Sequence, residues 1–174
     1  MTAGCATPTA EDIPPGDAHL GFANASTSSP VLVDGMSLDK ACGPRSPGGI
    51  EVHREIGQQD QRVATFTRGT CTRKKKLFTA RATDSGYTLK ISISGFGGYN
   101  RSYPLSYGSA DPGFVLEGPG GPWSTTFTPP IAIPTGSAIT FNRSGTQLAL
   151  TFPAVDSSGM NGALLAGLMR CTKK

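Results

Sequence analysis

The segment YTLKISIS, residues 87–94, alternates without interruption between apolar and polar side chains. Because successive side chains of a β-strand point to opposite faces, one face carries Tyr87, Leu89, Ile91 and Ile93. The opposite face carries only threonine, lysine and serine. The segment therefore predicts a strand that buries one face in a hydrophobic core and exposes the other to water.

Other short segments follow the same scheme along the chain. In QLALTF, residues 147–152, the apolar set is Leu148, Leu150 and Phe152. These segments are separated by runs rich in Gly, Pro, Asp and Ser, which favour turns. The composition of 37% hydrophobic residues, Gly 23 and Pro 14 also suits short strands more than helices. We therefore predict an all-β fold, an antiparallel β-sandwich or barrel-like domain.

The segment GALLAGLMRC, residues 162–171, admits two interpretations. Its alanine and leucine residues suit a helix, but Gly162 and Gly167 interrupt it and its length is short for a stable helix. We therefore favour a strand that closes the core.

The first 30 residues have a different texture. They consist mainly of Ala, Pro, Thr, Ser, Gly and scattered acids without hydrophobic periodicity, so they bury too little apolar surface to offset the entropy cost of ordering. We predict a flexible tether over residues 1–30 and a single β domain over residues 31–174.

The small residues Ala3 and Gly4 directly precede Cys5. Small residues before a cysteine are typical of the site that a bacterial lipoprotein signal peptidase recognises, although Thr2 stands where Leu or Val is usual. We predict Cys5 as a lipid-attachment site, where two or more acyl chains would hold the protein stably on a membrane. The alternatives are an unmodified thiol or a disulfide partner.

The layout of a lipid-attachment motif, a low-complexity tether and a small β domain resembles actinobacterial, in particular mycobacterial, cell-envelope lipoproteins. The motifs that carry the resemblance are Ala3-Gly4-Cys5, VLVDG at 31–35, GTCT at 69–72 and the late Cys171. They resemble the 19-kDa lipoprotein antigen group, in which an early cysteine is joined to a terminal one. The resemblance implies export to the outer face of the cell membrane or to the cell envelope.

The cysteines are widely spaced, without any C-x-x-C pair: Cys5, Cys42, Cys71 and Cys171. The only histidines are His19 and His53, so a structural zinc site is not expected, and we expect no cofactor. Disulfides in an oxidising compartment fit better. We favour Cys71 with Cys171. Pairing of Cys42 with Cys71, or of all four cysteines, stays open.

Positive charge is concentrated in the second part of the chain. Residues 1–60 hold eight acids and three bases, whereas residues 61–174 hold four acids and thirteen bases. The densest cluster is a basic run flanked by Arg68, and we predict as contacts for an anionic ligand Arg73, Lys74, Lys75, Lys76 and Arg81. The alternative is a solvated turn or a strand edge protected by lysines. Nucleic acid is not an expected partner, because no aromatic residues interleave with this run.

Catalytic residue types are scarce, and we predict no catalytic residue. The remaining catalytic hypothesis is a hydrolase that uses His53 with Glu51, Glu55 or Asp60, but no G-x-S-x-G surrounds any serine.

We therefore expect a non-catalytic, lipid-anchored envelope or surface protein that binds envelope lipid, glycan or a protein partner. The alternative is a soluble secreted, disulfide-bonded effector or enzyme inhibitor. In a eukaryotic secreted protein, the N-x-S sequons at Asn24, Asn100 and Asn142 would be glycosylation sites.

Overall fold

The computed structural model describes residues 32–33, 36–37, 48–99, 101–130 and 137–173. Within these ranges all regular structure is strand, which confirms the predicted all-β class. The predicted tether, Cys5 and Cys42 lie outside the described residues. The described part also holds no helix of the length and hydropathy that a membrane crossing requires.

The strands follow one another along the chain, and β1 and β2 form a small sheet of their own. Their bounds are β1 Leu32–Val33, β2 Met36–Ser37, β3 Ile50–Ile56, β4 Gln59–Phe66, β5 Arg68–Lys74, β6 Leu77–Asp84, β7 Tyr87–Ile93, β8 Tyr103–Pro104, β9 Gly113–Glu117, β10 Trp123–Ser124, β11 Ala138–Phe141, β12 Gln147–Asp156 and β13 Gly162–Lys173.

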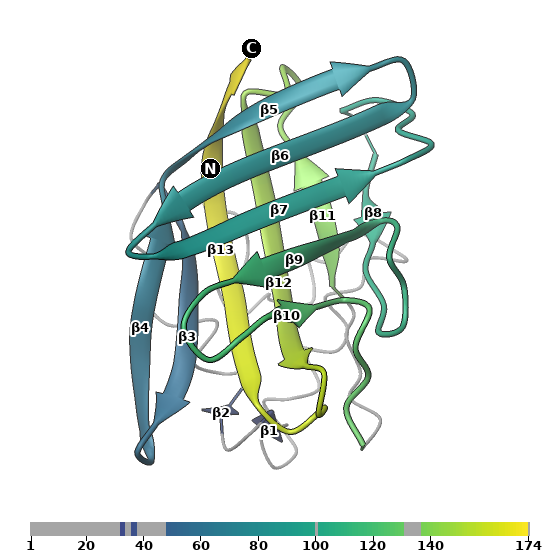
Figure 1. The fold of residues 1–174 in the computed structure, drawn as a ribbon. Coiled ribbons are helices and arrows are strands. Elements are labelled where there is room, and N and C mark those ends of the chain that lie inside the picture. Colours follow the sequence, from purple (N-terminus) through teal and green to yellow (C-terminus); the bar gives the residue numbers. More distant parts are fainter. Residues whose placement is uncertain (1–31, 34–35, 38–47, 100, 131–136, 174) are drawn as a thin grey trace, which may run out of the picture.

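The other eleven strands form one sheet that closes on itself. Its order is β4-β3-β13-β5-β6-β7-β9-β10-β12-β11-β8, and β13 also pairs with β12. A ring of seven strands therefore runs from β13 through β5, β6, β7, β9, β10 and β12 back to β13. In Figure 1, β5, β6, β7 and β9 cross in front of β13, β12 and β11. The prediction of a barrel-like domain is confirmed, with the parallel pair β13–β5 as the exception to its antiparallel pairing.

The segment 162–171 lies in strand β13, as predicted, and it holds the barrel together. Its residues 162–170 pair with β12, while its other edge pairs first with β3 and then with β5. Gly167 lies where β3 gives way to β5, with φ 141°, and a Cβ there would lie 2.0 Å from the carbonyl oxygen of Gly49. A glycine is therefore required at the position where the pairing partner of β13 changes from β3 to β5.

The core is built from the inward faces of the alternating strands. The four apolar residues of segment 87–94 are each at most 5% exposed, whereas Lys90 and Ser94 are exposed. Leu148, Leu150 and Phe152 of β12 are also buried, as predicted. The outward face of β5, β6, β7 and β9 is largely polar, with Leu77 and Val115 as apolar residues on it.

A disulfide joins Cys71 of β5 to Cys171 of β13, which confirms the favoured pairing. It links the two strands of the parallel pair, where Lys173 lies opposite Cys71. The crosslink spans 100 residues of sequence, and closing a loop of that length stabilises a fold by about 4–5 kcal/mol through the entropy of the unfolded chain.

Candidate functional site

The predicted basic run forms the tip of the β5–β6 hairpin. Arg73 and Lys74 end β5, Lys75 and Lys76 make the turn, and β6 begins at Leu77. All four cations are exposed, and the side chain of Leu77 beside them is 41% exposed. The structure therefore brings Arg73 to Lys76 together on one protruding turn that also presents an apolar side chain.

Aromatic rings connect this hairpin to the neighbouring turns. The guanidinium carbon of Arg73 lies 5.3 Å from the ring centroid of Phe96 and 5.9 Å from that of Tyr99. The Tyr99 ring packs closely against Gly145, in the turn between β11 and β12. In the same region, the backbone N–H of Cys171 donates to the carbonyl of Thr146 at 2.8 Å.

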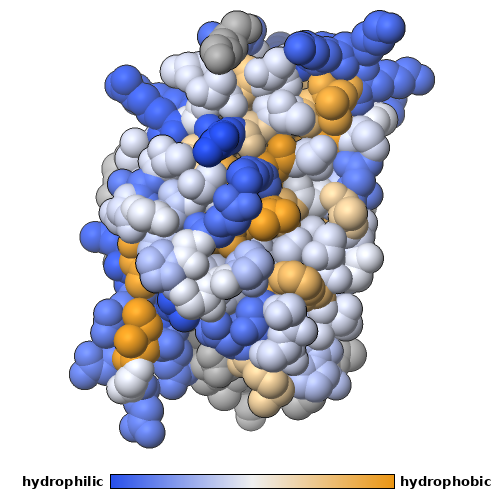
Figure 2. All heavy atoms as spheres, in the orientation of Figure 1, coloured by the Kyte–Doolittle hydropathy of each residue, from blue (hydrophilic) through white to orange (hydrophobic). Residues whose placement is uncertain are grey.

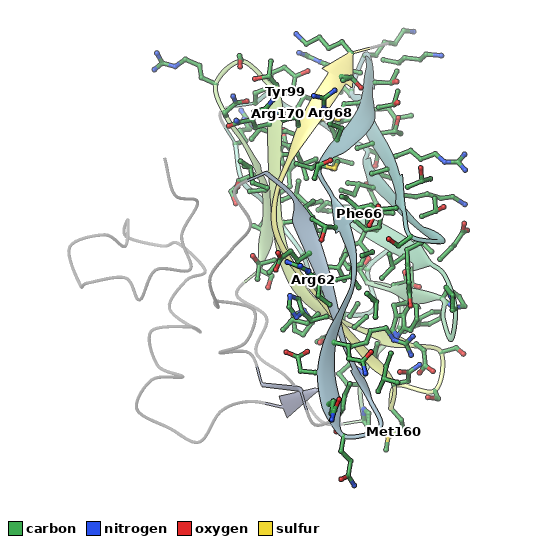
Figure 3. All side chains as sticks on the ribbon, turned by 90° about the vertical axis from the view of Figure 1, so that its left-hand side faces the viewer. Arg62, Phe66, Arg68, Tyr99, Met160 and Arg170 are labelled. Atoms are coloured by element: carbon green, nitrogen blue, oxygen red, sulfur yellow. A yellow bond between two sulfur atoms is a disulfide. The ribbon has the colours of Figure 1, made fainter. Side chains whose placement is uncertain are left out.

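Further cations lie at this end of the barrel. Arg143 belongs to the β11–β12 turn, Arg68 lies opposite Arg170 on β5 and β13, and Lys173 lies near the end of β13. Figure 1 shows these turns and the end of β13 at the top, and Figure 3 places Arg68, Arg170 and Tyr99 there. We call this set the basic end: Arg68, Arg73, Lys74, Lys75, Lys76, Arg143, Arg170 and Lys173.

The cations of the basic end are all exposed, and among the described residues none of them forms an ion pair. Two cations elsewhere are paired: Arg62 contacts Glu51 at 2.9 Å, and Lys90 contacts Glu117 at 2.5 Å. Like charges gathered on one surface repel one another and attract anions. The basic end can therefore hold an anionic surface or group.

Arg81, which we grouped with the basic run, lies elsewhere. It follows Leu77 by four residues on the same face of β6, about 13 Å along the strand from the hairpin tip. Its cross-strand neighbours are Thr70 and Lys90. The structure thus places Arg81 on the outward face of the sheet and apart from Arg73 to Lys76.

His53 lies between two carboxylates on the β3–β4 hairpin. Its Nε2 is 3.1 Å from an oxygen of Glu51, and its Nδ1 is 3.6 Å from an oxygen of Asp60. Arg62 donates to the second Glu51 oxygen at 2.9 Å. Within the part of the chain that the structure describes, no hydroxyl or thiol contacts the imidazole. The described residues thus place an imidazole beside two carboxylates without a hydroxyl or thiol hydrogen-bonded to it. The described residues also contain no group of three or more His, Cys, Asp or Glu placed to hold a metal ion.

Arg54 organises the loop EGPGGP, residues 117–122, and sequence analysis did not identify it. Its guanidinium carbon lies 4.4 Å from the ring centroid of Trp123, and it donates to the carbonyl of Pro119 at 2.7 Å. Trp123 is fully buried, so this loop presents no exposed ring to a ligand. A lone arginine in a strand carries no local signal for this role, because its hydrogen-bond partners Tyr87, Pro119 and Asn161 lie between 33 and 107 residues away.

The sequon asparagine Asn142 has a structural role in the β11–β12 turn. Its Nδ2 donates to Ser144 Oγ at 3.1 Å and to Thr146 Oγ1 at 2.9 Å, and its Oδ1 accepts from the N–H of Gln147 at 3.0 Å. Asn24 and Asn100 lie outside the described residues.

No protein-family model, curated protein or solved structure matches the chain.

Proposed function

We propose that the protein is an exported, lipid-anchored binding protein of the cell envelope, and that its basic end contacts anionic lipid head groups without catalysis. The observation that carries this proposal is the gathering of exposed cations at one end of the barrel without an ion-pair partner in the described residues.

The chemistry of the hairpin tip suits a membrane surface. Each Lys or Arg near an anionic bilayer contributes about 1 kcal/mol of binding free energy. Leu77, exposed beside three lysines, can enter the head-group region while the lysine ammonium groups remain at the phosphates. A soluble anion would use the charges equally well but would gain nothing from the exposed leucine.

Two features support an exported location for this proposal. The Cys71–Cys171 disulfide is stable in an oxidising compartment and rare in a reducing one. Cys5 is proposed as the acylated residue that keeps the domain near the bilayer, so the basic end needs only a weak attraction of its own to hold the domain against it.

The second candidate, a soluble secreted protein, is equally compatible with the disulfide. Intact mass of the protein, expressed with its native upstream sequence in its own host, separates the two. A diacylglyceryl adduct on Cys5 supports the anchored protein, whereas an unmodified or disulfide-bonded Cys5 supports the soluble one.

Vesicle co-sedimentation tests the lipid contact directly. We expect the unlipidated chain to bind vesicles containing phosphatidylglycerol at low salt and not to bind vesicles of phosphatidylcholine alone. Replacing Lys74, Lys75 and Lys76 by Gln should lower the partition coefficient about a hundredfold and flatten its salt dependence.

A variant of equal charge provides the control. Replacing Arg62, Arg81 and Lys90 by Gln removes the same number of cations away from the basic end and should change the partition coefficient by less than about threefold. Equal losses in the two variants would show attraction by net charge alone and would overturn the assignment to the basic end.

The catalytic hypothesis has its own test. A hydrolase that depends on His53 must lose activity on His53→Ala in a broad substrate screen. Absence of any activity in the wild-type chain would remove the hypothesis.

A further inference from the structure

We propose that a groove on the outer face of β5, β6, β7 and β9 binds an acidic oligosaccharide. The groove has a volume of about 600 Å³, within the range of small-ligand sites. Its face is turned toward the viewer in Figures 1 and 2, where small hydrophobic patches lie among hydrophilic and weakly polar side chains. This site is separate from the basic end and does not depend on the function proposed for it.

One row of hydroxyl side chains crosses the groove from strand to strand. In the register of the sheet, Thr72 lies opposite Thr79, Thr79 opposite Ser92, and Ser92 opposite Gly113. Neighbouring strands lie about 4.8 Å apart, so the three hydroxyls follow one another at a spacing similar to the length of a sugar ring. Gly113 contributes no side chain, and the carbonyl oxygen of Ala110 lies only 2.7 Å from where its Cβ would be, so the row of hydroxyls ends at Ser92.

These hydroxyls are available to a ligand. Within the described residues, Thr70, Thr72, Thr79 and Ser92 make no side-chain hydrogen bond. At the rim, by contrast, Ser124 Oγ donates to the carbonyl of Phe114 at 3.0 Å and accepts a hydrogen bond from Thr126 Oγ1 at 2.9 Å. The groove thus combines a fixed wall at Ser124 with free hydroxyls on β5, β6 and β7, and its lining also includes the apolar residues Ala80, Ile91 and Phe114.

A second row brings two cations together. Arg81 lies directly opposite Lys90, an arrangement that costs stability because like charges face each other across adjacent strands. Lys90 is compensated by Glu117 at 2.5 Å, whereas Arg81 forms no ion pair with any described residue. Only one of the two facing cations therefore has a carboxylate partner among the described residues, and the guanidinium of Arg81 is free to bind a carboxylate or sulfate through two parallel hydrogen bonds.

Of the apolar residues that line the groove, Ile91 and Phe114 are at most 3% exposed and Val115 is half-buried, so the groove offers a lipid chain or an apolar peptide no large exposed side chain. The large hydrophobic side chains that are exposed in the described part of the chain are Ile56, Leu77 and Met160, and none of them lines the groove. Free hydroxyls with one unpaired guanidinium complement a ligand that carries several hydroxyls and an anionic group. An acidic oligosaccharide has this chemistry.

The test is a titration of the full chain, followed by backbone amide chemical shifts. The probes are trigalacturonic acid and a hyaluronan tetrasaccharide, with galactotriose as the neutral counterpart. We expect shifts along β5, β6, β7 and β9 with at least one acidic probe, and binding of the neutral sugar weaker by about tenfold or more.

Substitutions in the groove that keep the strand conformation test whether the sugar binds there. Arg81→Gln should weaken the acidic probe about tenfold, and Thr79→Val with Ser92→Ala should weaken both classes of sugar severalfold. The matched control, Thr88→Val, removes a hydroxyl from the outer face of β7 outside the groove and should leave the affinity unchanged. Thermal unfolding of each variant verifies that it remains folded.

Two results would overturn the proposal. One is the absence of shifts at the groove with both acidic probes. The other is a response that disappears on replacing Lys74, Lys75 and Lys76 by Gln but survives Arg81→Gln, because the sugar would then bind the basic end. If the unsubstituted chain binds an acidic probe but does not bind vesicles containing phosphatidylglycerol, the proposed function alone is overturned.

Discussion

The cations at the two ends of this barrel differ in whether they have partners within the protein. At the basic end, every cation is exposed and none has an ion-pair partner among the described residues. At the other end, which we call the paired end, Arg54 covers Trp123 and donates to Pro119, and Arg62 holds Glu51 beside His53. Figure 3 shows Arg62 well below Arg68 and Arg170.

The difference indicates which charges serve the fold. A cation with internal partners contributes packing and hydrogen bonds, so its removal destabilises the protein. A cation without internal partners repels its neighbouring cations, and binding of an anionic partner compensates this repulsion. Substitutions at the paired end should therefore lower stability, whereas substitutions at the basic end should lower binding. The predictions below test this difference, from the largest expected effect to the smallest.

The largest effect is expected from the covalent link that holds the basic end together. Cys71→Ala with Cys171→Ala should lower the free energy of unfolding by about 4 kcal/mol, because the open chain gains conformational entropy and the repulsion at the basic end is no longer constrained. Urea unfolding measures this change. A loss below about 1 kcal/mol would mean that strand pairing alone closes the barrel.

The next effect belongs to the paired end. Arg54→Ala should lower the free energy of unfolding by about 3 kcal/mol, because it removes the contact with Trp123 and the hydrogen bond to the Pro119 carbonyl. Arg170→Ala is the matched control at the basic end and should change stability by less than about 0.5 kcal/mol. Equal losses would erase the distinction between the ends.

A pH-dependent effect of intermediate size is expected at Tyr107, whose hydroxyl donates to the carbonyl of Pro153. Burial raises the pKa of Tyr107 in the folded protein, whereas an unfolded tyrosine ionises near pH 10. The folded state therefore keeps its full stability below about pH 10 and loses it as the pH rises further, because only the unfolded chain releases the proton. Tyr107→Phe should show a shallower loss of stability than the wild type between about pH 9.5 and 11 in urea titrations. Parallel pH profiles would contradict this assignment.

The smallest effect on stability is expected at the tip of the β5–β6 hairpin, where substitutions should have the largest effect on vesicle binding. Lys74→Gln, Lys75→Gln and Lys76→Gln together should change the free energy of unfolding by less than about 0.5 kcal/mol and should stabilise slightly at low salt, because they relieve repulsion. Thermal unfolding at low and high salt measures this. A clear destabilisation would show that these lysines serve the fold.

The sequence predicted the parts of this structure that depend on local patterns. Alternation in residues 87–94 and 147–152 determined which side chains are buried, and the glycine-interrupted segment 162–171 was correctly assigned to a strand. The Cys71–Cys171 pair was also favoured correctly, although spacing alone left other pairings open.

What sequence could not supply depends on the register between distant strands. The parallel pairing of β13 with β5, which closes the barrel, has no local signature. Arg81 looked like a neighbour of the basic run, but the length of β6 carries it away from the tip and places it beside Lys90. His53 gained Asp60 and Glu51 as neighbours only through the pairing of β3 with β4.

The most direct test of the central claim is a map of backbone amides in the presence of anionic lipid bicelles. We predict line broadening at the β5–β6 tip, the β11–β12 turn and the end of β13, with undisturbed signals for β3, β4 and loop 117–122. Broadening that spreads evenly over both ends, or that is centred on the paired end, would contradict the account.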